Sequence, residues 1–314
     1  MDVSKSPYSS PLGHREAPWP AGADGPFAEA GPVGPRPPIA CRWRAPGTFA
    51  AACLRYDTSI ETRRSSMKIG ILGSGHIGKT LTQRLSAAGH DVKVANSRGP
   101  ETVEADVLTS GGRAVTAAEA VADVDVLILS IPLNRLPDIT PLLADVPADT
   151  VVVDTSNYYP LRDSRIEAIE AGQVESLWAT ELLGRPIAKA WNAIGSHSFA
   201  AKDKPAGSAD RIAIPVAADS DTDRRLAMAL VEDTGFDAFD AGTLADSWRQ
   251  QPGAPSYCTD LKREEMPGAL AAAEAERLPK RRDLGIAAVQ ERVGDSTTNP
   301  DAEYLVRLNR ALFM

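Results

Sequence analysis

The stretch MKIGILGSGHIG, residues 67–78, decides the fold of this 314-residue chain. Residues 68–72 are apolar on both faces, which predicts a central strand of a parallel sheet. The pattern Gly-x-Gly-x-x-Gly follows at once and opens a helix expected over 77–88, with Gly89 as its stop. A strand that passes through a glycine-rich turn into a helix is typical of a Rossmann-type dinucleotide-binding site.

Each of the three glycines has its own expected role. Gly73 allows a sharp turn, Gly75 lets the backbone approach a pyrophosphate, and Gly78 lets the helix pack closely on the strand. The N–H groups at the start of the helix favour phosphate binding. A chance glycine-rich turn is the alternative, and the strand–turn–helix context disfavours it. The predicted cofactor-binding residues of this loop are Gly73, Ser74, Gly75, His76, Ile77 and Gly78.

Strand and helix patterns alternate from residue 67 onwards. We predict strands over 91–96, 113–116, 124–130 and 150–154, separated by helices over 101–110, 117–122 and 136–144. Repeated β–α units of this kind form a parallel sheet with right-handed crossovers. The later pattern is looser and predicts helices over 163–171, 176–183 and 221–234 and additional strands over 187–191, 211–217 and 236–240.

The chain divides into three predicted parts. Residues 1–66 contain ten of the 24 prolines and no sustained period, so we expect a disordered N-terminal extension, with a true start at Met67 as the alternative. Residues 67–245 form the expected nucleotide-binding domain, and 246–314 a helical segment with helices near 267–277 and 302–312. The predicted fold class is therefore α/β: a Rossmann-type, doubly wound, mostly parallel sheet with a small helical C-terminal extension.

The end of the second predicted strand decides which dinucleotide is bound. NAD-specific sites place Asp or Glu there for the ribose hydroxyls, whereas this chain has Asn96, Ser97 and Arg98. The Arg98 guanidinium can bind a 2′-phosphate that a carboxylate would repel, and Ser97 can donate a hydrogen bond. We therefore predict that Ser97 and Arg98 select NADP(H). The alternative is that Arg98 is a solvated loop residue.

Further segments end predicted strands at the same edge of the sheet, where ligands of open α/β sheets bind. The predicted cofactor contacts there are Ser130, Ile131 and Pro132, and the predicted substrate contacts are Asn157, Tyr158 and Asn192. The alternatives are plain turns for the first two segments and a capping role for Asn192. No Ser/His/Asp set or carboxylate pair stands out, so no catalytic residue is assigned. Hydride transfer between rings requires apposition more than a proton donor.

Composition and charge exclude several functions. The net charge of −8 argues against nucleic-acid binding, which rests on basic patches. The longest apolar run, 124–133, is shorter than the roughly 20 residues that cross a bilayer. No signal-peptide pattern begins the chain, so we expect a cytoplasmic protein without a membrane partner. Three cysteines without a CxxC pair and four scattered histidines predict no metal site.

Several segments together resemble the NADP oxidoreductases named for coenzyme F-420, an 8-hydroxy-5-deazaflavin. They are residues 67–85, NSRGPE at 96–101, SIP at 130–132, DTSNYYPLRD at 154–163 and AKAWNAIGS at 188–196. The likeness covers most of 67–242 and extends to 248–251 and 257–260, whereas 263–314 do not match.

The resemblance implies a function and residues for it. Members of this family exchange hydride between NADPH and the deazaflavin without a dedicated acid or base, and a related domain of membrane metalloreductases reduces a flavin. By resemblance, residues 74–78, Ser97 and Arg98 would hold NADP, with Ser130 and Pro132 near the nicotinamide. Asn157 and Asn192 would lie near the second ring, which would be coenzyme F-420 or a flavin as small-molecule electron acceptor.

Two other functions stay open. A reductase of a small imine or hydroxy acid shares the N-terminal fold, but such enzymes have a long interdomain helix where this chain has strand patterns at 211–217 and 236–240. A non-catalytic NADP(H) sensor would bind the nucleotide without turnover. A homodimer also stays open, because residues 263–314 could close the substrate pocket or form a dimer contact.

Overall fold

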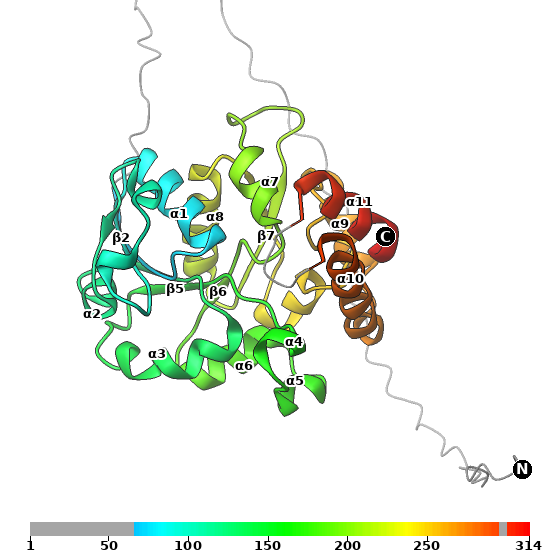
Figure 1. Ribbon diagram of the computed structural model, residues 1–314, viewed down its shortest axis with the longest axis horizontal. Helices are drawn as coiled ribbons and strands as arrows, with labels where there is room; N and C mark the ends of the chain where they lie inside the picture. Colours follow the sequence, from blue (N-terminus) through cyan, green and yellow to red (C-terminus); the bar gives the residue numbers. More distant parts are fainter. Residues whose placement is uncertain (1–65, 295–299) are drawn as a thin grey trace, which may run out of the picture. The chain divides into compact units, whose positions relative to one another are not determined.

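One mixed sheet of eight strands organises the computed structural model, which describes residues 66–294 and 300–314 (Figure 1). In spatial order the strands are β3 (Arg113–Ala114), β2 (Asp91–Ala95), β1 (Lys68–Leu72), β4 (Val126–Leu129), β5 (Val151–Asp154), β6 (Ala188–Lys189), β7 (Ala213–Ala218) and β8 (Asp237–Asp240). Strands β1 to β6 are parallel, whereas β7 runs antiparallel to β6 and β8 runs parallel to β7. The predicted, mostly parallel α/β sheet is confirmed, and its order reverses between β1 and β4.

Helices cover both faces of the sheet, as the residue pattern of the strands requires (Figure 1). Ile69 and Ile71 of β1 share one core cluster with Leu81 and Leu85 of the first helix. The helices of that face are α1 (His76–Ala87), α7 (Ser196–Ala201) and α8 (Asp221–Asp233). The helices of the opposite face are α2 (Ala117–Val121), α3 (Leu136–Leu143) and α6 (Glu175–Leu183). Within the described part of the chain, no helix combines the length and the apolar character needed to cross a bilayer.

Two predicted helices are wrong. The segment 101–110 instead forms the 3-10 turns η1 (Pro100–Thr102) and η2 (Ala105–Leu108). Its polar groups are satisfied locally, since the Thr102 hydroxyl donates to Gly99 O at 2.8 Å and the Asn96 side chain bonds that hydroxyl. The segment 163–171 breaks into α4 (Pro160–Asp163) and α5 (Glu167–Glu170), because Ser164 takes a left-handed backbone conformation with φ 61°.

The C-terminal segment contains more helix than predicted. It follows η4 (Leu244–Gln250) and forms α9 (Met266–Ala271), η5 (Ala275–Arg277), α10 (Leu278–Val293) and α11 (Ala302–Phe313). A further 3-10 turn, η3 (Leu133–Arg135), lies between β4 and α3. The sequence analysis missed α10, whose proline lies in the first helical turn, where a missing N–H costs nothing. Helix α11 confirms its prediction and is capped by Asp301, whose side chain accepts from the Tyr304 N–H at 2.9 Å. The predicted disorder of the N-terminal extension falls on residues 1–65, which lie outside the described residues.

The glycine-rich turn brings three backbone segments into direct contact. A Cβ atom at Gly73, where φ is +112°, would lie 2.1 Å from the Ser130 carbonyl oxygen. A Cβ atom at Gly78 would lie 1.9 Å from the Gly73 carbonyl oxygen. A Cβ atom at Gly75 would meet nothing within 4 Å. Two glycines are therefore needed for packing, whereas the third leaves open space beside the turn.

We expect Gly78→Ala to destabilise the protein by about 1–3 kcal/mol, because its methyl group would collide with a backbone oxygen that cannot move aside. Denaturant unfolding measures the change. Gly75→Ala is the matched control, with an ordinary φ of −70° and an open Cβ position, and its stability should stay within about 0.5 kcal/mol of the parent. Equal stability of the two variants would contradict the packing role of Gly78.

Candidate nucleotide and substrate site

A cavity of about 480 Å³ lies at the carboxyl ends of the parallel strands, beside the start of α1. The segments that leave the strands are held side by side there: Ser130 N donates to Leu72 O at 2.8 Å, and Thr155 N to Leu129 O at 3.0 Å. Predicted site residues that line the cavity are Gly75, His76, Ile77, Ser130, Ile131, Pro132, Asn157 and Asn192. The other predicted residues, which do not line it, are Gly73, Ser74, Gly78, Ser97, Arg98 and Tyr158.

The start of α1 offers backbone donors to this cavity. The first intrahelical bond runs from Lys79 N to Gly75 O at 2.7 Å, so the N–H groups of residues 76–78 have no acceptor within the helix. His76 is exposed at this end, and Gly75 presents bare backbone to the open space. Free N–H groups, a positive helix end and room beside a glycine fit the pyrophosphate of a dinucleotide.

The loop after β2 is tied to this turn through Asn96. Its side-chain amide donates to Ser74 Oγ at 3.4 Å, and its carbonyl oxygen accepts from the backbone N–H of Arg98 at 2.9 Å. Ser97 and Arg98 are both exposed, and no described residue forms a hydrogen bond or ion pair with the Arg98 guanidinium. The guanidinium is therefore available to a phosphate next to the glycine-rich turn, as the 2′-phosphate hypothesis requires.

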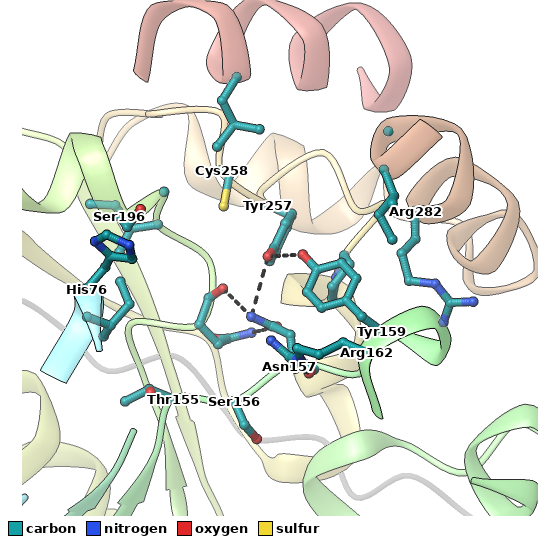
Figure 2. Close-up of a pocket in the computed structure, with 18 of the residues that line it drawn as sticks. His76, Thr155, Ser156, Asn157, Tyr159, Arg162, Ser196, Tyr257, Cys258 and Arg282 are labelled. Carbon is teal, nitrogen blue, oxygen red and sulfur yellow. Dashed lines mark hydrogen bonds between the residues drawn. The ribbon is translucent and has the colours of Figure 1, made fainter. Parts of the chain in front are cut away.

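An amide network forms the floor of the substrate side. The Asn157 amide donates to Asn192 O at 2.9 Å, and the Asn192 amide donates to Asn157 Oδ1 at 3.1 Å. Gln250, which is fully buried, donates to Asn192 Oδ1 at 2.9 Å. The two asparagines predicted from separate strand ends are thus brought together, each holding the other's orientation; Figure 2 shows Asn157 in this network.

Two tyrosines above this network face each other across the cavity wall. The hydroxyls of Tyr159 and Tyr257 lie 2.5 Å apart, and Asn157 Nδ2 donates to the Tyr257 hydroxyl at 3.4 Å (Figure 2). Burial raises the pKa of both phenols well above the usual value. Burial likewise raises the pKa of the neighbouring Cys258 thiol. All three groups keep their protons near neutral pH and can offer hydrogen bonds, but not a base or a thiolate.

The position of Tyr158 contradicts its prediction as a substrate contact. Its ring is fully buried in the core cluster beneath α3 and α6, and its hydroxyl accepts from Ile166 N at 3.1 Å. The next residue, Tyr159, lines the cavity instead. Successive residues of an extended segment point in opposite directions, so the sequence located the pair and the packing decided which member faces the site.

Three buried ionisable groups lie beneath the cavity. Lys189 Nζ donates to Asp154 Oδ2 and to Ser156 O, both at 2.6 Å, and both charged side chains are fully buried. Ser156 donates to the same carboxylate at 3.0 Å. Glu175 accepts from Tyr158 N at 3.1 Å, and burial raises its pKa from 4.5 to about 7 against the opposing effect of Lys189. The strand ends that carry Asn157 and Asn192 are thereby joined by a buried charge pair.

Strained backbone occurs at the cavity wall. Trp191 and Cys258 line the cavity with φ values of 57° and 51°, a left-handed conformation that costs about 1–3 kcal/mol in residues other than glycine. Cys258 N donates to Ala193 O at 2.8 Å, which joins the two turns. Asn309 of α11 donates to Tyr257 O at 3.3 Å and to Cys258 O at 3.4 Å. The last helix therefore holds the turn that presents Tyr257 to the cavity.

The C-terminal helices complete the cavity, which the sequence analysis left open between a pocket cover and a dimer contact. Helix α10 contributes Arg282, Gly285, Ile286 and Val289, which share one helix face, and α11 contributes Leu305. Other lining residues that sequence reasoning missed are Tyr159, Arg162, Trp191, Tyr257 and Cys258. Most of them lie in the segments quoted for the family resemblance. The sequence therefore located these segments, but it did not show which of their side chains point into the cavity.

The fold defines a protein of the Rossmann class, with a cavity at the sheet edge where ligands of this class bind. Residues 68–158 match the family described as NADP oxidoreductase coenzyme F420-dependent, which confirms the resemblance over that segment.

The chain is also similar to individual proteins. The solved structure of hypothetical protein SMa0349 from Sinorhizobium meliloti is 29% identical, with a TM-score of 0.54 over 62% of this chain and 94% of that one. A structure named "putative f420 dependent nadp-reductase" from Arthrobacter sp. FB24 is 16% identical, with a TM-score of 0.49 over 75% of this chain and 99% of that one. The Escherichia coli (strain K12) protein YjhV is 48% identical over 62 residues, which are 20% of this chain. Since the match spans 45% of YjhV, the chain aligns with less than half of that relative.

We expect Glu175→Gln to stabilise the protein above pH 7 and to change stability little below pH 4.5. The pKa of Glu175 is about 7 in the folded protein and about 4.5 in the unfolded chain. As the pH rises from 4.5 to 7, the unfolded chain releases the proton first, so the parent protein loses folding stability over this range. The glutamine variant has no such proton and avoids this loss. The shift corresponds to at most about 3 kcal/mol. Glutamine keeps an oxygen that can accept from Tyr158 N.

Urea unfolding at pH 4.5 and at pH 8 tests this expectation, with the exposed Glu167→Gln variant on α5 as the control for loss of one carboxylate. If Glu175→Gln shifts stability equally at both pH values, the raised pKa is not the cause.

Proposed function

We propose that this protein is an NADPH-dependent oxidoreductase that transfers hydride between NADP(H) and a deazaflavin or flavin acceptor. The observation that carries the proposal is the single cavity that runs from the free N–H groups of α1 to the paired Asn157 and Asn192. Its volume of about 480 Å³ lies in the range of small-molecule sites.

The cofactor side is supported by the backbone and by Arg98. The N–H groups of residues 76–78 would bind the pyrophosphate, and Arg98 with Ser97 would bind the 2′-phosphate that distinguishes NADP(H) from NAD(H). Ser130, Ile131 and Pro132 form the cavity wall at the end of β4. When bound, NADPH supplies a hydride from its nicotinamide ring.

The proposed acceptor side is supported by residues that can donate hydrogen bonds but cannot act as a base. The phenols of Tyr159 and Tyr257 stay protonated, and the Asn157 amide is held in place by Asn192. Such groups bind the polar edge of a ring and orient it, whereas none of them removes a proton. A hydride exchange between two rings needs this kind of positioning and exclusion of water.

The proposed activity is tested by stopped-flow mixing of purified protein and NADPH with coenzyme F-420, FMN, riboflavin, a cyclic imine or a small keto acid. We expect NADPH oxidation with the deazaflavin or the flavins, and none without an acceptor. Oxidation with the imine or keto acid alone would replace the proposed acceptor class. Tight NADPH binding without oxidation in any mixture would indicate a sensor.

We expect Arg98→Glu to weaken NADPH binding by at least about tenfold, because a charged contact is lost and a repulsion is gained. Equilibrium titration followed by nucleotide fluorescence measures the affinity. NADH, which lacks the 2′-phosphate, is the internal control and should bind parent and variant alike. Equal loss of NADH and NADPH affinity would mean that Arg98 acts on the loop rather than on the phosphate.

A further inference from the structure

The charges around the cavity are one-sided. The chain has 42 acidic and 34 basic residues other than histidine, yet Asp and Glu are absent from the described residues that line the cavity. Arg162 and Arg282 do line it. A wall of this kind favours a ligand with negative charge.

The two arginines lie away from the glycine-rich turn. Figure 2 shows His76, at the start of α1, on one side of the cavity and Arg162 and Arg282 on the other, with Asn157 and Tyr257 between them. The pyrophosphate of a dinucleotide at α1 would be served by backbone N–H groups on the first side. The two arginines therefore lie at the end of the cavity that is left for the second substrate.

Arg162 is already committed to partners. Its guanidinium donates to Asn157 O at 2.6 Å and to both carboxylate oxygens of the buried Asp163 at 2.8 Å. Its guanidinium also lies 5.2 Å from the centre of the Tyr159 ring. Its role is to hold the 157–163 loop, and its charge is balanced within the protein.

Arg282 is not balanced in this way. It is only 8% exposed, and its Nε donates to Asp283 at 2.8 Å, a carboxylate that is 61% exposed and therefore well screened by water. The guanidinium lies 5.3 Å from the centre of the Tyr158 ring. Its two terminal nitrogens have no acceptor among the described residues. The charge of Arg282 also acts on Glu175, but burial keeps that carboxyl group's pKa near 7. Terminal nitrogens without a protein acceptor can donate to an anionic group of a ligand.

The helix places this arginine beside an apolar surface. Arg282, Ile286 and Val289 recur at the spacing of one face of α10, and all line the cavity. A ligand that extends along this face would contact apolar side chains first and a cation at the end. That arrangement matches a ring system that carries an acidic tail.

We propose that Arg282 is a specificity-determining residue that binds a phosphate or carboxylate group on the tail of the electron acceptor. The proposal rests on the proposed function, which supplies the ring that carries this tail. Arg282 lies outside residues 68–158, the segment that matches the family. It predicts a preference between acceptors with the same ring and different charge.

FMN and riboflavin provide the matched ligands, because they share one isoalloxazine ring and differ by a phosphate. Binding is measured by quenching of flavin fluorescence with the full chain saturated with NADP⁺, so no turnover is needed. We expect FMN to bind at least about tenfold tighter than riboflavin. Coenzyme F-420 and its deazaflavin core without the acidic tail form a second pair, which separates a carboxylate-bearing tail from a simple phosphate.

Arg282→Gln should reduce FMN affinity to that of riboflavin and leave riboflavin affinity unchanged, which also reports that the cavity is intact. Arg282→Lys should retain part of the preference. Arg292→Gln is the matched control, since Arg292 lies on the same helix, stacks on Tyr304 at 5.2 Å and does not line the cavity. It should behave as the parent.

Equal binding of FMN and riboflavin by the parent, or a preference that survives in Arg282→Gln, would overturn the assignment of Arg282, as would the absence of binding in both pairs. A preference for FMN without NADPH oxidation would leave the assignment of Arg282 standing and count against the proposed activity alone.

Discussion

The buried ion pair between Asp154 and Lys189 is the interaction on which the substrate side of this protein depends. It joins the last residues of β5 and β6 just before the sheet reverses direction at β7, and neither side chain contacts solvent. A buried pair of this kind adds little net stability, because desolvation offsets much of the attraction. Its contribution is geometric: the ammonium group also binds Ser156 O, which fixes the start of the loop that carries Asn157 and Tyr159.

A second constraint comes from the end of the chain. Helix α11 binds the carbonyl groups of Tyr257 and Cys258 through Asn309 and that of Thr259 through Arg310. These bonds hold a turn in which Cys258 has a strained, left-handed backbone. The helical extension is thus part of the cavity rather than an accessory to the sheet, and the proposed acceptor side is built from residues more than a hundred positions apart.

The cavity has two ends of different chemistry. At one end, backbone N–H groups and the helix dipole attract phosphate without any positively charged side chain in the wall. At the other end lie protonated phenols, an oriented amide and one face of α10 that carries Arg282 beside apolar side chains. This asymmetry suits two different ligands bound end to end, which is what an exchange of hydride between a nucleotide and a second ring requires.

The amino-acid sequence by itself determined the sheet, its order at the switch point, the glycine-rich turn and the strand ends that meet the cavity. These features depend on local periodicity and on the spacing of glycines within one short turn, which a single stretch of sequence contains. The tertiary structure alone decided that Tyr159 rather than Tyr158 faces the site, that the pattern at 101–110 forms 3-10 turns, and that Arg282 on α10 reaches the cavity. The first and last of these outcomes depend on burial and on contacts between distant segments, and the turns at 101–110 depend on specific hydrogen bonds, neither of which the periodicity of residues contains.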